Sequence, residues 1–340
     1  MDESENKTWT DISGTEDSAS RSGMPVSKQL MVLVGVLAIM FVVGGASAYL
    51  AHDKKTPDQQ EVVPAYVAER PNVDVDRTRF SDIDLLAESA LVMDVRSGEI
   101  LYEKEPDTRR PLASITKLMT ALVAKEIVDE GAVIPITAAA LEQSGDNHLR
   151  AGERFSYKKL SDLMLLVSSN DGAYALSSAA GALLDPDTPE TAFVKAMNVR
   201  ARELGLSFTT FRNPTGLDIS ESEAGAYGTA REVAKLASYI LANYPDLLES
   251  TTRSEAVIGN EAGEVHAVYN TNLVVDEMAK VIGSKTGYTT LAGGNLVTAF
   301  DVGLDRPMVA VVLGSSYQGR FSDMVKLVQA TLNEINNPNQ

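Results

Sequence analysis

Apolar residues cluster in two short stretches near residue 90 and in longer stretches toward the C-terminus. Residues 90–95 and 99–102 carry strand-like patterns, and the Arg-Ser-Gly turn at 96–98 between them predicts a hairpin. From about residue 255 the pattern again favours strands, and the clearest runs are 281–287, 294–300 and 308–313. The last run is apolar throughout, which predicts a buried strand.

Between these two groups of strands, apolar residues recur at the spacing typical of helices. Helices are predicted at residues 114–129, 156–167, 173–184, 191–204 and 229–243, with a further amphipathic helix at 321–335. Because strands and helices are segregated instead of alternating, we expect an α+β fold. Its antiparallel sheet should be covered by helices, and an all-helical subdomain should be added to it.

The N-terminal part of the chain holds three segments of different composition. Residues 1–29 are polar and acidic, which predicts a disordered tail. Residues 30–51 contain no charged side chain and are long enough to cross a bilayer, so we expect a transmembrane helix there. The alternative is a signal peptide cleaved near Ala48, although the apolar run exceeds the usual length of a signal core. Residues 52–82, with spaced prolines, predict a linker, and the folded domain should span 83–335.

Composition excludes several classes of function. The chain has no cysteine, so a disulfide, a thiol nucleophile and a cysteine zinc site are all impossible. Its net charge of −17 argues against nucleic-acid binding, which needs a basic surface. The three histidines, at 52, 148 and 266, are not spaced as metal ligands, and we expect neither a metal nor a cofactor.

A first candidate for chemistry is the Ser114-Ile115-Thr116-Lys117 sequence at the start of the helix predicted from residue 114. Residues three apart share one face of a helix, so the Ser114 hydroxyl and the Lys117 amine can meet. A hydroxyl becomes nucleophilic when a nearby base removes its proton, and a lysine with a lowered pKa can be that base. On its own this spacing is equally typical of a helix-capping serine and a solvated lysine.

Two further short motifs follow in a fixed order. Ser168-Ser169-Asn170 lies in a turn between two predicted helices, and Lys285-Thr286-Gly287 lies on a predicted strand. Each alone is typical of an ordinary turn or edge strand. The set of S-x-x-K, S-x-N and K-T-G in this order is the motif set of penicillin-binding proteins and class A β-lactamases.

More of the chain resembles one branch of that superfamily, the low-molecular-mass D-alanyl-D-alanine carboxypeptidases. The matching residues are 111–120 (PLASITKLMT), 170–173 (NDGA), 213–218 (NPTGLD), 270–272 (NTN) and 285–293 (KTGYTTLAG). The resemblance implies a β-lactamase/transpeptidase-like fold and makes 83–335 a serine DD-peptidase catalytic domain. Two positions depart from the family pattern: Ser169 replaces the usual glycine, and Thr271 stands where some members carry a substrate-handling arginine.

The resemblance also implies roles for the motif residues. Ser114 would be the nucleophile and Lys117 its base, with a pKa lowered by repulsion from Lys285 and helped by burial. Ser168 would relay a proton to the leaving amine, and Asn170 would hold Lys117 or the substrate amide.

The strand motif would bind the substrate. Lys285 and Thr286 would bind its terminal carboxylate. Gly287 would let the strand backbone approach the ligand. The backbone N–H groups of Tyr288 and Ser114 would form the oxyanion hole.

The resemblance implies a carboxypeptidase that acts on peptidoglycan pentapeptides and is inhibited covalently by β-lactams. Endopeptidase and transpeptidase use the same acyl-enzyme and stay open. A β-lactamase would need a loop glutamate, for which only the position of Glu190 qualifies. A membrane-anchored β-lactam sensor is the non-enzymatic alternative, and the lack of a G-x-S-x-G motif argues against a Ser-His-Asp hydrolase. Because peptidoglycan lies outside the cell, we expect a single-pass membrane protein, held in the lipid bilayer by 30–51, with a cytoplasmic N-terminus and an extracytoplasmic catalytic domain.

Overall fold

The computed structural model describes residues 79–145, 149–278 and 280–336. The predicted tail at 1–29, the predicted membrane helix at 30–51 and the linker as far as residue 78 therefore lie outside the described residues. Among the described helices, none is both long and apolar enough to cross a membrane.

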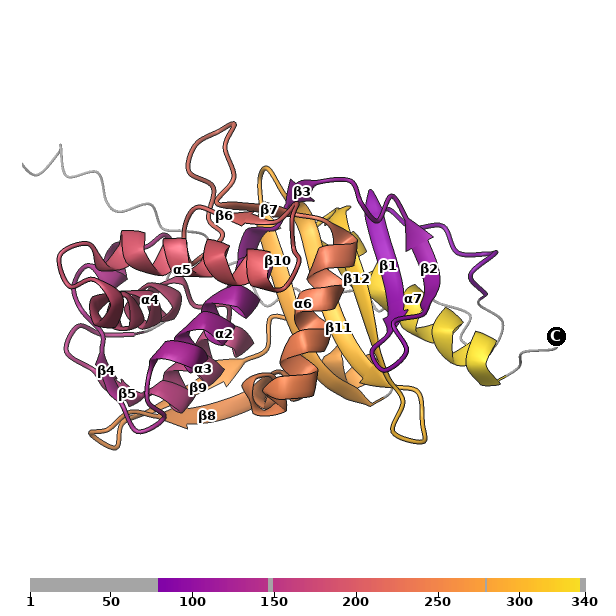
Figure 1. Ribbon diagram of the computed structural model, residues 1–340. Coiled ribbons are helices and arrows are strands. Elements are labelled where there is room, and N and C mark those ends of the chain that lie inside the picture. The colour runs from indigo at the N-terminus through magenta and orange to yellow at the C-terminus, as the bar shows by residue number, and fades with distance from the viewer. Residues whose placement is uncertain (1–78, 146–148, 279, 337–340) are drawn as a thin grey trace, which may run out of the picture. The chain divides into compact units, whose positions relative to one another are not determined.

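The centre of the described fold is a five-stranded sheet in the order β10-β11-β12-β1-β2, in which every neighbouring pair is antiparallel (Figure 1). The strands are β1 (Ser89–Asp94), β2 (Ile100–Lys104), β10 (Val281–Thr289), β11 (Gly293–Asp301) and β12 (Pro307–Ser315). The predicted hairpin and the three C-terminal strands are all present. Pairing of β1 with β12 joins the first strand to the last, and this long-range contact closes the domain.

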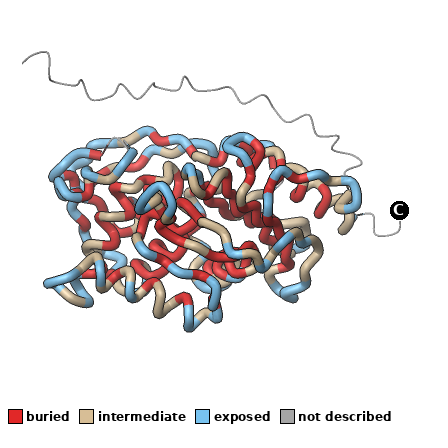
Figure 2. The backbone as a smooth tube through the Cα atoms, turned by 90° about the horizontal axis from the view of Figure 1, so that it is seen from above, coloured by how far each residue is buried: buried red, intermediate tan, exposed pale blue. Residues whose placement is uncertain are grey.

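The two faces of the sheet carry separate apolar cores. Leu91 and Val311 belong to the core on the side of α6 (Ala230–Asn243), whereas Val92 and Val312 belong to the core under α7 (Gly319–Asn336). This division follows from the period of two in a strand, which sends successive side chains to opposite faces. Figure 2 shows the resulting buried stretches running through the middle of the molecule, with exposed loops around them.

A helical part lies beside the β10 end of the sheet (Figure 1). Its helices are α2 (Lys117–Ile127), α3 (Tyr157–Leu166), α4 (Asn170–Leu184) and α5 (Pro189–Glu203). The prediction of an all-helical subdomain is wrong in one respect. A short sheet of β4 (Val133–Pro135) and β5 (Arg154–Ser156) packs on α3 and α4, and the hairpin of β8 (Glu255–Gly259) and β9 (Val265–Tyr269) packs on α3. Strands of three residues, such as β4 and β5, carry too few positions for alternation to reveal them.

A third small sheet pairs β3 (Arg110–Pro111) with β7 (Ala226–Gly228) and β7 with β6 (Thr210–Phe211). Strand β3 of this sheet ends just before the 3₁₀ helix η1 (Ala113–Thr116), which leads into α2. Because β10 is the edge strand of the main sheet, its outer edge is free to face other elements. It packs against η1 and against the 3₁₀ helix η4 (Glu249–Thr252). The three sequence motifs meet along this edge.

Candidate active site

Ser114 lies in η1, one turn before α2, and not in the α-helix that its sequence predicted. In a 3₁₀ helix, side chains three residues apart lie directly above one another. The Lys117 Nζ atom is 2.9 Å from the Ser114 Oγ atom. Ala113, the preceding residue, has a φ of +47°, a left-handed conformation that is strained for a residue with a Cβ atom.

Lys117 is fully buried, and its amine has two further partners. The Nζ atom donates to Asn170 Oδ1 at 2.7 Å and to the backbone oxygen of Thr215 at 2.8 Å. A neutral amine has two N–H groups and one lone pair. If the N–H groups serve Asn170 and Thr215, the lone pair is left pointing at the Ser114 hydroxyl. This arrangement is that of a general base next to its nucleophile.

Burial lowers the pKa of Lys117 to about 7. The prediction that repulsion from Lys285 is the main cause of this lowered pKa, with burial second, is wrong, because burial accounts for the shift. The pKa of Lys285 is also lowered well below its usual value, first by burial and then by repulsion from Lys117 and Arg320. Removing an ammonium group from water disfavours its charged form, so two buried amines at one site are both driven toward neutrality.

The second motif brings a hydroxyl to Lys285. Ser168 lies in the turn between α3 and α4 with a φ of +63°, and the Lys285 Nζ atom donates to its Oγ atom at 2.9 Å. Ser169, which departs from the family pattern, caps α4 by accepting a hydrogen bond from the N–H of Gly172 at 2.9 Å. Asn170 is the first residue of α4, and the structure brings it to Lys117.

Thr286 and Thr271 present two hydroxyls to the same pocket, with their Oγ1 atoms 2.6 Å apart. From the sequence alone, no role is assigned to Thr271.

Arg320 is a further pocket residue, which the sequence motifs do not include. It is almost fully buried, lines the pocket and donates to the backbone oxygen of Gly287 at 3.0 Å. Arg320 lies in the first turn of α7, where the helix dipole disfavours a cation. A basic side chain at the start of a helix, where it is unfavourable, is the sequence signal that could have identified Arg320.

Gly287 has a different neighbour from the one expected. A Cβ atom at this position would lie 2.9 Å from the backbone oxygen of Leu112 and 3.2 Å from the N atoms of Ser114 and Ile115. Glycine therefore lets β10 pack against the turn that carries the nucleophile. The next residue, Tyr288, is half exposed and packs edge-on against Tyr317 with ring centroids 4.9 Å apart.

The 213–218 loop supports the nucleophile turn from the other side. Asn213 Oδ1 accepts hydrogen bonds from the N–H groups of Thr215 and Gly216, which fixes the Thr215 carbonyl that faces Lys117. A Cβ atom on Gly216 would lie 1.9 Å from the backbone oxygen of Ala113. The conformation of the nucleophile turn thus depends on a residue about a hundred positions away in the sequence.

These residues surround a pocket of about 370 Å³. It is lined by Ser114, Ser168, Asn170, Leu217, Asn270, Thr271, Leu273, Thr286, Gly287, Tyr288, Tyr317 and Arg320. A larger pocket, of about 600 Å³ between α2 and α5, contains none of the predicted site residues. Glu190 lines a separate pocket, where it accepts a hydrogen bond from the Tyr174 hydroxyl at 2.8 Å. No cluster of three metal-ligating side chains occurs within 79–145, 149–278 and 280–336.

Comparison with known proteins gives the family. A model of the D-alanyl-D-alanine carboxypeptidase family matches residues 76–317. The chain belongs to this family. A D-alanyl-D-alanine carboxypeptidase of Bacillus subtilis is 32% identical over 71% of this chain and 60% of its own length. A D-alanyl-D-alanine endopeptidase of Pseudomonas aeruginosa is 32% identical over 72% of this chain and 76% of its own length. This chain thus spans about 60% of the Bacillus relative.

The fold is that of a penicillin-binding protein. Penicillin-binding protein D2 from Listeria monocytogenes, solved in its ampicillin-bound form, has a TM-score of 0.60 and 28% identity, covering 73% of this chain and 98% of that one. The predicted α+β, transpeptidase-like fold is confirmed for the described residues. Hydrogen bonds join Ser114 to Lys117 and Lys117 to Asn170, and Lys285 lies near enough to Lys117 for their charges to repel.

The lowered pKa of Lys117 predicts how acylation depends on pH. Only the neutral amine can accept the Ser114 proton, so the second-order rate constant for acylation by a penicillin should rise with pH and level off above a pKa of about 7. Below that point the rate should change about tenfold per pH unit, as for a single proton. Stopped-flow measurement with a fluorescent penicillin would test this. A rate that falls as pH rises through 7 would mean that the charged amine is the active form.

A second prediction concerns Gly216. Gly216→Ala should slow penicillin labelling by about a hundredfold or more, because the new Cβ atom would displace the Ala113 carbonyl and with it Ser114. Gly98→Ala is a matched control: Gly98 also has a positive φ, +73°, but a Cβ atom there meets nothing within 4 Å. Both variants should lose about 1 kcal/mol of stability from backbone strain at a positive φ, and Gly216→Ala should lose more because of its clash. Equal labelling rates in the two variants would contradict the steric argument.

Proposed function

We propose that this protein is a serine-type D-Ala-D-Ala carboxypeptidase that trims peptidoglycan stem peptides through an acyl-enzyme. The observation that carries the proposal is the contact between the Ser114 hydroxyl and the Lys117 amine at 2.9 Å, together with the lowered pKa of that amine. A serine with a neutral amine at hydrogen-bond distance is an activated nucleophile. Membership of the carboxypeptidase family supports the choice of substrate.

In the acylation step, Ser114 Oγ attacks the carbonyl carbon between the two terminal D-alanines while Lys117 takes the hydroxyl proton. The negative charge that develops on the carbonyl oxygen needs preorganised donors. The N–H groups of Ser114 and Tyr288 are suited to this role, since Gly287 lets the two backbones approach closely.

The tetrahedral intermediate then expels the terminal D-alanine, whose nitrogen must gain a proton. The proton that Lys117 took from Ser114 must reach this nitrogen, and Ser168, which accepts a hydrogen bond from Lys285, would relay it, giving up its own proton and receiving this one in its place. The terminal carboxylate would lie against Thr286 and Thr271, near the amine of Lys285 and the guanidinium of Arg320. Water finally hydrolyses the ester on Ser114, which releases the shortened peptide and restores the hydroxyl. β-Lactams would inhibit by acylating the same serine.

An endopeptidase acting on crosslinks is a second candidate, because the Pseudomonas relative carries that name. The two activities share the acyl-enzyme and differ only in the leaving amine. A β-lactamase is disfavoured, because the only glutamate considered for fast deacylation, Glu190, lines a pocket other than that of Ser114.

Ser114→Ala should abolish covalent labelling by a fluorescent penicillin while leaving the circular dichroism spectrum unchanged, since one hydroxyl is lost without steric change. Ser97→Ala, in the exposed β1–β2 turn, is the control and should label normally. For the unaltered protein, mass analysis of a muropeptide pentapeptide should show loss of one terminal D-alanine. Cleavage of a crosslinked dimer without loss of D-alanine from the pentapeptide would establish the endopeptidase instead. Labelling of Ser114→Ala would refute the nucleophile assignment.

We also propose that residues 30–51 anchor the protein in the cell membrane, with residues 1–29 in the cytoplasm and the catalytic domain outside. The uncharged character of 30–51 and the external location of peptidoglycan support this placement. Protease added to intact spheroplasts should degrade the 83–335 domain, and the domain should sediment with membranes. Recovery of a soluble domain that begins near Ala48 would instead indicate cleavage of a signal peptide.

A further inference from the structure

On the outer edge of β10, just before the K-T-G motif, a backbone N–H group is hydrogen-bonded to a side chain. Ser284, whose backbone N–H points away from β11, donates it to the Oγ1 atom of Thr251 at 2.9 Å. Thr251 is 1% exposed, and it belongs to η4, a segment that none of the sequence motifs includes. An edge strand normally leaves such groups to water or to another strand. Here a buried threonine fixes the edge one residue before Lys285.

The Thr251 hydroxyl can only accept a hydrogen bond from the Ser284 N–H, because its own proton is already engaged elsewhere. The hydroxyl proton is used toward the backbone oxygen of Leu248 at 2.6 Å. On the other side of the residue, the backbone oxygen of Thr251 accepts from Asn270 Nδ2 at 2.9 Å and from Ser284 Oγ at 3.4 Å. A hydroxyl with a single proton already engaged is a fixed acceptor, so Thr251 sets the position of the β10 edge.

A second connection runs from Thr251 through Asn270 to the pocket. The residue after Asn270 is Thr271, whose N–H donates to the backbone oxygen of Leu166 at 3.1 Å and whose hydroxyl meets that of Thr286 at 2.6 Å. Thr251 therefore reaches the Thr271–Thr286 hydroxyl pair by two routes, one along β10 and one through the 270–272 loop. Each route begins with a buried hydrogen bond at Thr251, from the Ser284 N–H in one case and from the Asn270 side chain in the other.

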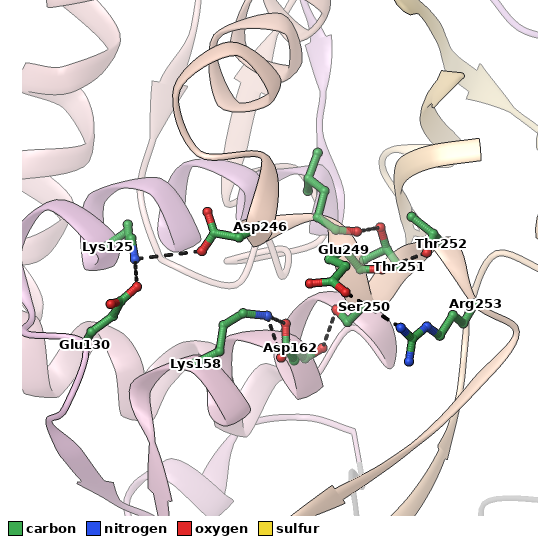
Figure 3. A network of polar contacts seen from close by, with 11 residues as sticks. Lys125, Glu130, Lys158, Asp162, Asp246, Glu249, Ser250, Thr251, Thr252 and Arg253 are labelled. Carbon is green, nitrogen blue, oxygen red and sulfur yellow. Dashed lines mark hydrogen bonds and ion pairs between the residues drawn. The ribbon is translucent and has the colours of Figure 1, made fainter. Parts of the chain in front are cut away.

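The outer side of the same segment rests on the helical part. Figure 3 shows Ser250 turned toward Asp162 of α3, beside the Lys158–Asp162 ion pair, and shows Asp246 near Lys125 of α2. Burial raises the pKa of the Asp162 carboxyl, and Lys158 holds it as a partner at 2.6 Å. The segment thus lies between α3, which ends just before Ser168, and β10, the strand that carries Lys285 and Thr286.

We propose that Thr251 is a positioning residue that holds the Thr271–Thr286 hydroxyl pair in place for the terminal carboxylate of the substrate. The inference rests on the proposed function, because it assumes that this pair binds a carboxylate. Thr251 touches neither substrate nor nucleophile, and acts through Ser284 and Asn270. A displacement of about 1 Å at such a site is enough to reduce a rate about a hundredfold.

The test compares two thioester substrates with the same acyl group. One has a D-thiolactate leaving group, with a carboxylate beside the scissile bond, and the other has a neutral thiol leaving group of similar size. In the unaltered protein, the ratio of their kcat/KM values measures recognition of the carboxylate. Thr251→Val keeps the shape but removes the acceptor of the Ser284 N–H, and should lower this ratio at least tenfold, mainly through the carboxylate substrate.

Two further variants separate positioning from stability. Thr251→Ser retains the hydroxyl and should restore the ratio of the unaltered protein. Thr331→Val, in α7, removes another buried hydroxyl, one that donates to the backbone oxygen of Leu327 at 2.7 Å, and should leave the ratio unchanged at a similar loss of Tm. If Thr251→Val does not fold, Thr251→Cys, with a weaker acceptor of similar size, replaces it and should lower the ratio in the same direction.

The outcomes distinguish the two proposals. If the unaltered protein does not prefer the carboxylate substrate, the proposed carboxylate subsite is wrong, and the role of Thr251 is wrong with it. If the unaltered protein prefers that substrate but Thr251→Val loses activity equally on both, the proposed function stands and the positioning role is overturned. The positioning role is supported if Thr251→Ser keeps the ratio of the unaltered protein while Thr251→Val and Thr251→Cys lower it.

Discussion

The site depends on two lysine amines buried without a carboxylate to pair with. Lys117 is 0% exposed and Lys285 is 1% exposed, and among the described residues their hydrogen bonds go only to neutral oxygens. Burying an ammonium group this way is costly, and the group responds by giving up its proton more easily. A carboxylate beside either amine would have reversed the shift and removed the base. The rest of the fold is needed to keep these two groups dry and apart from acidic side chains.

That requirement explains why the site draws on so many separate elements. The Lys117 amine is surrounded by η1, by the start of α4 and by the 213–218 loop, each of which supplies one oxygen. The backbone is left-handed at Ala113, next to the Ser114 hydroxyl, and at Ser168, which carries the other serine hydroxyl of the site. Strain of this kind persists only where the surroundings hold it in place, which is why it gathers at functional sites. The glycines at 216 and 287 allow that close packing.

Charge is distributed unevenly in this protein. The chain has a net charge of −17, yet the amines of Lys117 and Lys285 and the guanidinium of Arg320 gather at one site. Arg320 is also buried, with its guanidinium 4.4 Å from the ring centre of Tyr317. A local cationic group in an acidic protein favours a small anion, such as a terminal carboxylate, over a polyanion such as nucleic acid.

The amino-acid sequence by itself determined the main strands, the helices and their order, because the periods of two and 3.6 leave a record in each segment. It also predicted that Ser114 and Lys285 are candidates for chemistry, since residue type and spacing alone identify a hydroxyl and an amine. Only the tertiary structure decided that β1 pairs with β12, that burial governs the pKa of Lys117, and that Arg320 lines the pocket. These facts depend on contacts between residues far apart in the chain. Local patterns carry no information about such contacts, because packing and desolvation arise only when the segments meet.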